Sequence, residues 1–135
     1  MTQSRIVVLG GGFAGVGAAR KLEKLLKHRP DVEIVLVSRT NFFVITPLLF
    51  EACSGTLELR HCAQPIRPAL RRSRFVEATV TSVDAARRTI HMMADGAESE
   101  LDYDHLVVAL GASTNLSVIP GSESALTFKT MADAL

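Results

Sequence analysis

The sequence predicts an α/β fold in which a parallel β-sheet carries an inserted antiparallel β-meander at about residues 79–103. Three observations lead to this fold class. Two apolar runs, residues 6–9 and 32–37, have the pattern of buried parallel strands, and a helical pattern lies between them. A glycine-rich turn joins the first run to the helix. Short extended runs without helical periodicity then occupy residues 79–103.

The first helix is predicted over residues 16–27. Its apolar positions recur at helical spacing, and Glu23 and Lys27 are expected to form an i,i+4 ion pair on the outer face. Pro30 ends the helix, because proline disfavours a helical conformation in the residue before it. The strand, helix, strand order predicts a right-handed crossover between two parallel strands. The apolar stripe consists of Val16, Ala19, Leu22, Leu25 and Leu26.

The turn before this helix contains a glycine motif that is typical of dinucleotide binding. Gly10, Gly12 and Gly15 stand in G-x-G-x-x-G register between a strand and a helix. The chain turns sharply at the first glycine, approaches a pyrophosphate at the second and packs helix on strand at the third. The helix N-terminus offers N–H groups and a positive dipole to phosphates. An ordinary flexible turn is the alternative explanation.

The residues after the second strand are Ser38 and Arg39, where a dinucleotide site usually carries an acid that bonds the ribose. A serine hydroxyl can also bond a ribose, and a guanidinium can stack on adenine or reach a phosphate. Both residues are therefore candidate ligands of the nucleotide. The alternative is a solvated pair at a strand end.

Two further short helices are predicted. Thr46 is expected to cap a helix that runs to Gly55, with Pro47 at its first position. Residues 65–72 are expected to form the other helix, with Arg71 and Arg72 at its C-terminus, where the dipole favours cations.

The second half of the chain is predicted to be mostly extended. Short runs around Val80, Ile90 and Leu101 form the meander, with a tight turn at residues 95–96. Residues 106–110 then form a buried parallel strand that ends at Gly111. Because ligands bind at the carboxyl ends of parallel strands, a second close backbone approach is expected there.

The composition fits a single domain with no electrostatic preference for nucleic acid or acidic lipid. The chain has 135 residues, 47% of them hydrophobic, and a formal net charge of +1. Its most apolar run, residues 42–50, is shorter than the ~20 residues that span a bilayer. No signal peptide is seen, so a cytoplasmic location is expected. Cys53 and Cys62 lack metal or redox spacing and are expected to be reduced thiols.

Three segments together resemble the FAD-binding half of the two-dinucleotide-binding-domain flavoproteins, the group that is like pyridine nucleotide-disulfide oxidoreductases. They are the glycine loop at residues 10–15, the 79–103 meander and residues 103–111. Within that group, residues 41–49 (Asn-Phe-Phe-Val-Ile-Thr-Pro-Leu-Leu) and the later Gly55-x-x-x-x-Arg60-His61 look most like type II NADH:quinone oxidoreductases. The resemblance covers essentially the whole chain and implies a Rossmann-like FAD-binding domain over residues 1–135.

The resemblance implies a role for each part of the site. The glycine loop would cradle the FAD pyrophosphate, Val80 would lie at the adenine, Thr46-Pro47 would reach the isoalloxazine, and residues 109–111 would line the opposite side. Together with the two residues after the second strand, the expected FAD ligands are Gly10, Gly12, Phe13, Ala14, Gly15, Ser38, Arg39, Thr46, Pro47, Val80, Ala109, Leu110 and Gly111.

The implied activity is hydride transfer from NADH through FAD to a membrane quinone, without proton pumping. The flavin carries the redox chemistry, so neither His61 nor Glu51 is assigned as an acid or base. No metal site is expected. The C-x-x-x-x-C pair of related disulfide reductases is missing, so a redox disulfide is not expected.

Other features of the chain predict the N-terminal part of a longer enzyme. A second G-x-G-x-x-G for NADH is missing, and Thr130-x-x-Asp133 begins a helix just before residue 135. The full-length enzyme is expected to lie peripherally on the inner face of the membrane, and this chain is expected to contact a missing domain or a second copy. Two alternatives stay open: a reductase with a ferredoxin-type, sulfide or nitrite-linked acceptor, and a stand-alone nucleotide-binding module that is not an enzyme.

Overall fold

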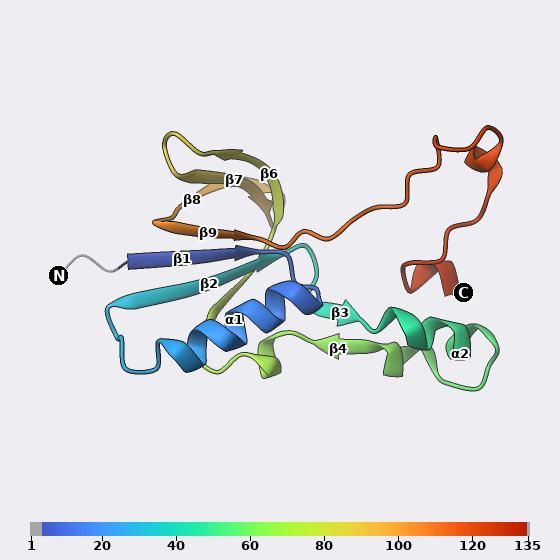
Figure 1. Ribbon diagram of the computed structural model, residues 1–135, viewed down its shortest axis with the longest axis horizontal. Coiled ribbons are helices and arrows are strands. Elements are labelled where there is room, and N and C mark those ends of the chain that lie inside the picture. Colours follow the sequence, from blue (N-terminus) through green and yellow to red (C-terminus); the bar gives the residue numbers. More distant parts are fainter. Residues whose placement is uncertain (1–3, 135) are drawn as a thin grey trace. The chain divides into compact units, whose positions relative to one another are not determined.

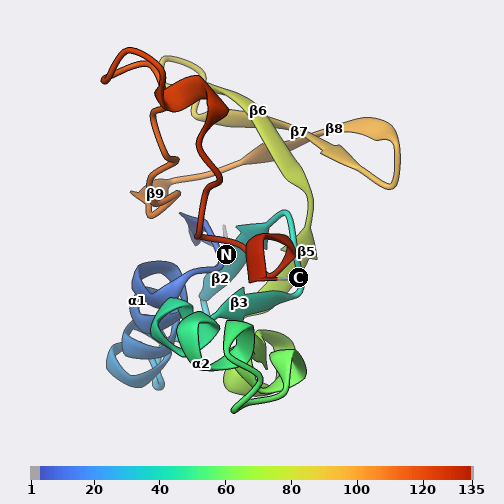
Figure 2. The ribbon, with the colours of Figure 1, turned by 90° about the vertical axis from the view of Figure 1, so that its right-hand side faces the viewer.

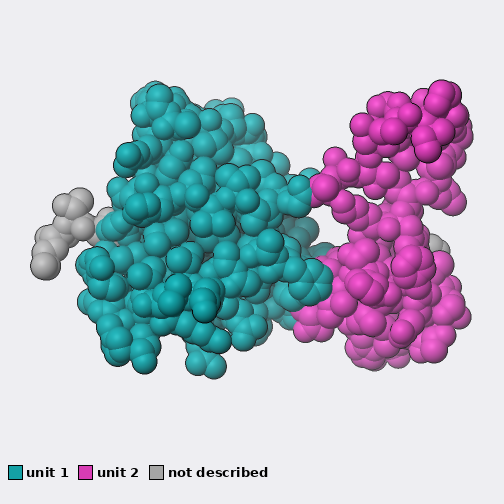
Figure 3. Space-filling view, in the orientation of Figure 1, with its two compact units in different colours: residues 1–43, 65–111 teal, residues 44–64, 112–135 magenta. Residues whose placement is uncertain are grey.

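A computed structural model of the chain describes residues 4–134, which fold into two compact units (Figure 3). Unit 1 comprises residues 1–43 and 65–111, and unit 2 comprises residues 44–64 and 112–135. The prediction that residues 1–135 form one FAD-binding domain stays a prediction.

Unit 1 is built on a four-stranded sheet with the order β5-β2-β1-β9. Every neighbouring pair is parallel, as the fold class predicted. The central strands β1 and β2 are the most buried, whereas β9 has a neighbour on one side only. The strands are β1 (Ser4–Leu9), β2 (Val32–Ser38), β5 (Arg74–Glu77) and β9 (His105–Val108).

Helix α1 (Phe13–Leu25) connects β1 to β2 and covers one face of this sheet (Figure 1). The predicted β-α-β unit is therefore confirmed, with the helix beginning three residues before its expected start. Val16 and Ala19 face inward and are buried, and Val16 packs with Val8 and Leu36 of the sheet. Leu25 was wrongly placed in the apolar stripe, since it is 67% exposed.

The predicted antiparallel meander covers the other face of the sheet (Figure 2). It consists of β6 (Thr79–Asp84), β7 (Thr89–Ala94) and β8 (Ala97–Asp102), in that order. The tight turn between β7 and β8 is confirmed, because Asp95 and Gly96 both have positive φ, 51° and 79°. Apolar side chains from the sheet and the meander share one core cluster: Val7, Leu9, Val35, Val37, Ala78, Ile90, Met92 and Leu101.

The helix predicted over residues 65–72 is wrong. The structure has strand β4 (Ala63–Pro65) and a single 3-10 turn, Arg67–Ala69. Pro68 lacks the N–H group that a helix continuing from residue 65 would need, which limits the segment to one turn. Arg72 therefore has no helix of its own to cap, and its guanidinium instead donates to carbonyls of residues 26, 29 and 32.

The ion pair predicted between Glu23 and Lys27 is also wrong. Helix α1 ends before Lys27, and Glu23 lies on the inner side with 7% of its surface exposed. Its carboxylate accepts hydrogen bonds from residues 71–73, so a contact distant in sequence has replaced the local one.

A charged cluster at the other end of the sheet joins three strands. Glu33 on β2 bonds the guanidinium of Arg5 on β1 at 2.6 Å and that of Arg74 on β5 at 2.8 Å. Partial burial by itself raises the pKa of Glu33, but the hydrogen bonds from both arginines outweigh it, so the pKa lies below its ordinary value.

Unit 2 is made of short elements. Strands β3 (Phe42–Val44) and β4 pair as a two-stranded sheet, of which Val44, Ala63 and Gln64 belong to unit 2. A 3-10 turn (Thr46–Leu48) leads into helix α2 (Leu49–Cys53), and further 3-10 turns lie at Leu59–Cys62, Ser122–Ser124 and Ala132–Ala134. The predicted helix at residues 46–55 is therefore partly 3-10. Thr46 was wrongly predicted as its N-cap, because the cap position is Ile45 and no side-chain hydrogen bond caps that turn.

The last turn of unit 2 confirms the predicted capping motif. The backbone N–H groups of Lys129 and Thr130 donate to Asp133 at 2.7 Å, and the Asp133 N–H donates back to the Thr130 hydroxyl at 3.3 Å. The two backbone hydrogen bonds are the main reason that the pKa of Asp133 is lowered to about 2. Within residues 4–134, no helix combines the length and apolar character needed to cross a membrane.

The core of unit 1 generates a stability prediction. Leu36 is fully buried in the cluster with Val8 and Val16, so Leu36→Ala is expected to cost about 2–5 kcal/mol of unfolding free energy. Urea unfolding followed by circular dichroism measures the cost. Leu126→Ala is the matched control, since Leu126 is 98% exposed and should change little. Equal effects of the two substitutions would contradict the packing described.

The Glu33 cluster generates a pH prediction. Because the folded-state pKa of Glu33 is lowered, its stabilising contribution is complete above its ordinary value of 4.5 and is lost as pH falls through the folded-state pKa. Glu33→Gln is therefore expected to destabilise the chain at pH 7 and to reduce the fall in stability between pH 5 and pH 3. Urea midpoints across this range test the prediction, and parallel pH curves for parent and variant would refute it.

Candidate functional site

The candidate site is the edge of the parallel sheet where β1, β2 and β9 end. Gly10 leaves β1 with φ 106°, and its N–H donates to the Val37 carbonyl of β2 at 2.8 Å. On its other side, the Ala109 N–H donates to the Leu9 carbonyl at 2.8 Å. A Cβ on Gly10 would lie 2.1 Å from the Ala109 carbonyl oxygen. The chain can therefore pass between the two neighbouring strand ends only with glycine at this position.

The next close contacts join helix α1 to this turn. A Cβ on Gly15 would lie 1.7 Å from the Gly10 carbonyl oxygen, so the first turn of the helix packs directly on the glycine loop. A Cβ on Gly11 would lie 2.5 Å from the Ser38 Oγ and 2.5 Å from a methyl carbon of Ile66. Gly10 and Gly15 thus have the turn and packing roles that the motif predicted.

Gly12 differs from its neighbours, since the fold itself does not require glycine there. Its φ of −80° is accessible to any residue, and a Cβ built on it meets no atom within 4 Å. Gly12 is the N-cap of α1, with no side-chain cap hydrogen bond and no acidic residue in the first turn. The space at the Gly12 Cα is therefore open, and no side chain of the described residues caps the first-turn N–H groups at the positive end of the helix dipole.

The structure also brings the end of β2 to this loop. The Ser38 hydroxyl lies beside Gly11, and the Ser38 carbonyl accepts a hydrogen bond from Ala78 N–H at 2.9 Å, where the chain enters the meander. Arg39 is exposed. Val80 is half-buried and packs against the core between sheet and meander, which leaves part of its side chain at the surface.

The end of β9 completes the site within unit 1. The predicted strand at residues 106–110 is shorter than expected, because β9 ends at Val108 and the chain then turns away at Gly111, whose φ is 74°. Its predicted burial is wrong, since Val108 is 65% exposed and β9 is an outer strand of this sheet. Ala109 lies against Gly10 and Gly15, and Leu110 is exposed. The close approach of the backbone to a ligand at Gly111 stays a prediction. Phe13 lies at the start of α1, 60% exposed, with its ring edge-on to Phe43 at a centroid distance of 5.0 Å.

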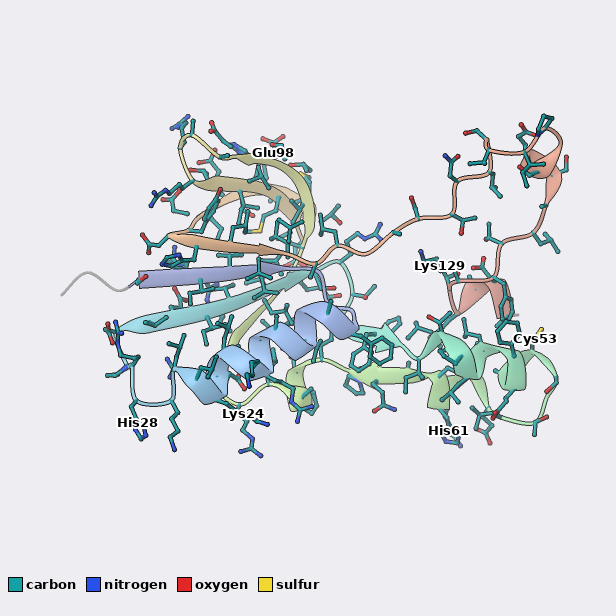
Figure 4. All side chains as sticks on the ribbon, viewed as in Figure 1. Lys24, His28, Cys53, His61, Glu98 and Lys129 are labelled. Carbon is teal, nitrogen blue, oxygen red and sulfur yellow. The ribbon has the colours of Figure 1, made fainter. Side chains whose placement is uncertain are left out.

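The remaining predicted ligands, Thr46 and Pro47, belong to unit 2, and their approach to an isoalloxazine stays a prediction. Unit 2 also carries Cys53, which is exposed, and His61 (Figure 4). Both cysteines are free thiols, and Cys62 is buried. Among residues 4–134, no group of three or more His, Cys, Asp or Glu side chains could hold a metal ion.

Sequence reasoning missed the role of Glu23, whose spacing from Lys27 indicated only an exposed ion pair. It also missed Ile66, which packs on Gly11 but follows a proline in a segment that was expected to be helical. Neither residue carries a local signal, because each contact joins segments that are far apart along the chain.

A glycine loop that leads from a central parallel strand into a helix, with a strand end on either side, defines a dinucleotide-binding α/β protein. Residues 4–135 match the family described as pyridine nucleotide-disulphide oxidoreductase, so the chain belongs to that family. The predicted recognition and fold class are confirmed. Membership implies a flavin cofactor.

Several relatives agree with the narrower resemblance. The chain is 34% identical to the external alternative NAD(P)H-ubiquinone oxidoreductase B4 of Arabidopsis thaliana mitochondria, over 98% of this chain and 24% of that protein. It is 36% identical to the type II NADH:quinone oxidoreductase Ndh of Mycobacterium tuberculosis, over 80% of this chain and 23% of that protein. The chain therefore spans about a quarter of the length of these relatives.

A solved structure shows the same arrangement of elements. NDH2 from Plasmodium falciparum, in complex with NADH, superimposes with a TM-score of 0.84 at 29% identity. The match covers 98% of this chain and 27% of that one. Water-forming NADH oxidase from Lactobacillus brevis has a TM-score of 0.75 at 19% identity and supports the fold alone.

Two substitutions in the glycine loop are expected to have different effects. Gly12→Val is expected to keep the fold and abolish nucleotide binding, because its side chain would fill the open space at the helix N-terminus. Gly15→Val is expected to prevent folding of unit 1, because its Cβ would overlap the Gly10 carbonyl. Circular dichroism reports the fold, and calorimetry reports binding. If Gly12→Val binds FAD as tightly as the parent, the loop is only a turn.

Proposed function

We propose that this chain is the FAD-binding part of a type II NADH:quinone oxidoreductase. The observation that supports this most is the open space at Gly12. The contacts of Gly10, Gly11 and Gly15 explain those glycines by packing, whereas the glycine at position 12 is explained by a ligand that approaches the backbone closely. A pyrophosphate at the N-terminus of α1 is such a ligand.

In this proposal each part of the site holds a defined part of FAD. The glycine loop, with Phe13 and Ala14 at the start of α1, binds the pyrophosphate through backbone N–H groups. Ser38 and Arg39 lie at the adenosine ribose, and Val80 lies at the adenine. Residues 109–111 line the cofactor on the side of β9, and Thr46-Pro47 contact the isoalloxazine. When bound, the flavin supplies the hydride-accepting chemistry of the enzyme.

The side chains of this site bind and orient the cofactor and carry no acid–base role in the proposal. Ser38 is neutral, so its hydrogen bond to a ribose hydroxyl is weaker than that of a carboxylate. Binding therefore depends mainly on the helix N-terminus and on the backbone of the glycine loop. This makes the pyrophosphate, which FAD has and FMN lacks, the main determinant of affinity.

The relatives support a quinone as the electron acceptor and NADH as the electron donor of the full-length enzyme. The chain is 34% identical to a protein named NAD(P)H-ubiquinone oxidoreductase and 36% identical to one named NADH:quinone oxidoreductase. These relatives favour a quinone as the electron acceptor over a ferredoxin-type, sulfide or nitrite-linked acceptor. NADH binding requires a second dinucleotide domain, since residues 10–15 form the single G-x-G-x-x-G of this sequence. We place the full-length enzyme peripherally on the inner face of the membrane, where a quinone is accessible.

The proposal predicts that this chain binds FAD more tightly than NADH. The meander after β5 and the β9 end beside Gly10 are the arrangement that the resemblance to FAD-binding flavoproteins implies, and they support this preference. Isothermal titration calorimetry with each nucleotide tests the preference, and the Gly12→Val variant is the control for binding outside the loop. Tighter binding of NADH than of FAD would remove the FAD proposal.

The proposal also predicts that residues 1–135 alone do not catalyse NADH oxidation, even with FAD bound. Hydride transfer requires the nicotinamide to be held ~3–3.5 Å from the flavin, and such positioning is worth roughly 7–11 kcal/mol of the barrier. The assay follows NADH oxidation with a soluble quinone, against free FAD at the same concentration. A rate well above that of free FAD would show that an NADH site exists in this chain or in an assembly of its copies.

A further inference from the structure

The carboxylate of Glu23 occupies an anion-binding nest made by the chain's own backbone. Its Oε1 atom accepts hydrogen bonds from the backbone N–H groups of Arg71, Arg72 and Ser73, at 3.0, 2.9 and 2.8 Å. The Ser73 hydroxyl donates to the same oxygen at 2.8 Å. Consecutive N–H groups that converge in this way form a concavity that binds anions. Glu23 therefore ties helix α1 to the segment that leads directly into β5.

The same segment contacts the end of α1 a second time. One guanidinium nitrogen of Arg72, Nη1, donates to the Leu26 carbonyl at 2.6 Å. Its Nη2 donates to the carbonyls of Arg29 and Val32, at 2.9 and 2.7 Å. The Leu26 carbonyl is at the C-terminus of α1, where the negative end of the helix dipole favours a cation. The Glu23 carboxylate on the helix thus accepts hydrogen bonds from the facing segment, and the Arg72 guanidinium on that segment donates one to the end of the helix.

These contacts fix the position of α1 relative to the sheet. The segment at residues 71–73 continues into β5, which pairs with β2 up to Ser38, one of the proposed ligands. At the other end of the helix, Gly15 packs on Gly10. The first N–H groups of α1 are therefore held from both ends of the helix, by Gly15 near the N-terminus and by Glu23 and Arg72 near the C-terminus.

We propose that Glu23, with Arg72, is a positioning residue for the nucleotide site, which holds helix α1 so that its N-terminal N–H groups meet the pyrophosphate. This inference rests on the proposed function and assigns to Glu23 and Arg72 a role in cofactor affinity. Neither residue touches the cofactor. The effect reaches the site through the rigid body of α1, whose dipole and first turn supply most of the binding.

The nature of residue 23 supports a role beyond packing. It follows Val16 and Ala19 on the buried side of α1, where a leucine would bury apolar surface without removing a charge from water. Partial burial by itself raises the pKa of Glu23, but the four hydrogen bonds outweigh it, so the group remains a carboxylate at neutral pH. A charge held in this way fixes one geometry, whereas an apolar contact permits the helix to slide.

The test compares Glu23→Gln with Glu98→Gln, a matched change at an exposed position on β8 (Figure 4). FAD and ADP are the probes, because both carry the pyrophosphate and only one carries the flavin. Titrations are carried out where circular dichroism shows both variants folded, and Kd is calculated for the folded fraction. Glu23→Gln is expected to raise both Kd values about tenfold, the factor that ~1.4 kcal/mol produces, and Glu98→Gln to leave them unchanged.

A spectroscopic measurement separates positioning from a purely structural role. In two-dimensional amide NMR, the signals of residues 12–16 are expected to shift in Glu23→Gln and not in Glu98→Gln, although residue 23 lies about two to three helical turns away. If Glu23→Gln does not fold, Arg72→Gln replaces it, with the same direction of change expected. A structural role would lower stability while leaving the Kd of the folded fraction and these signals unchanged.

The outcomes distinguish this inference from the proposed function. If the unsubstituted chain binds neither FAD nor ADP, the proposed function fails and this inference fails with it. If the unsubstituted chain binds both, and the folded Glu23 or Arg72 variant binds them within twofold of the parent, the positioning role is overturned and the FAD site stands.

Discussion

The structure of unit 1 depends on one steric constraint, the passage of Gly10 between the ends of β2 and β9. Strand β1 lies between β2 and β9, and the chain leaves it at Gly10. The space there accommodates a hydrogen atom on the Cα but not a Cβ. That passage directs the chain into α1, places the helix on one face of the sheet and leaves the opposite face to the meander. It also brings Ala109 against the start of the helix, so the constraint that forms the fold forms the site as well.

The glycines of this loop have two different explanations. At positions 10, 11 and 15 the neighbouring atoms of the chain itself exclude a side chain, and any substitution must move backbone or buried groups. At position 12 the space is open, and in the proposed function the restriction comes from the bound cofactor. In one short loop, Gly10, Gly11 and Gly15 are therefore needed for the packing of the fold, and Gly12 is assigned to cofactor binding.

The sequence predicted those features that local patterns determine. Periodicity located β1, α1, β2 and the meander, and the positive φ values of Asp95 and Gly96 follow from ordinary turn chemistry. The errors lie where distant segments decide the outcome. Residues 65–72 contain a helix-like pattern, yet their backbone N–H groups bond Glu23 and the Arg72 side chain bonds the end of another helix. The turn at residues 10–15 was predicted because the glycine motif contains it, whereas Ser38, Arg39 and residues 109–111 were expected from the ends of predicted strands. Their roles as ligands, like those of Val80, Thr46 and Pro47, stay predictions.

Strand β9 has a consequence for handling this protein in solution. It is an outer strand of the parallel sheet, with β1 on one side, and its sequence His-Leu-Val-Val contains no lysine or proline. Val108 on this strand is 65% exposed. Lysine, proline and bulges are the usual means by which proteins protect a sheet edge from joining the edge of another molecule. Concentrated preparations of this chain will therefore tend to self-associate by strand addition, and a lysine at position 108 is the simplest way to discourage it.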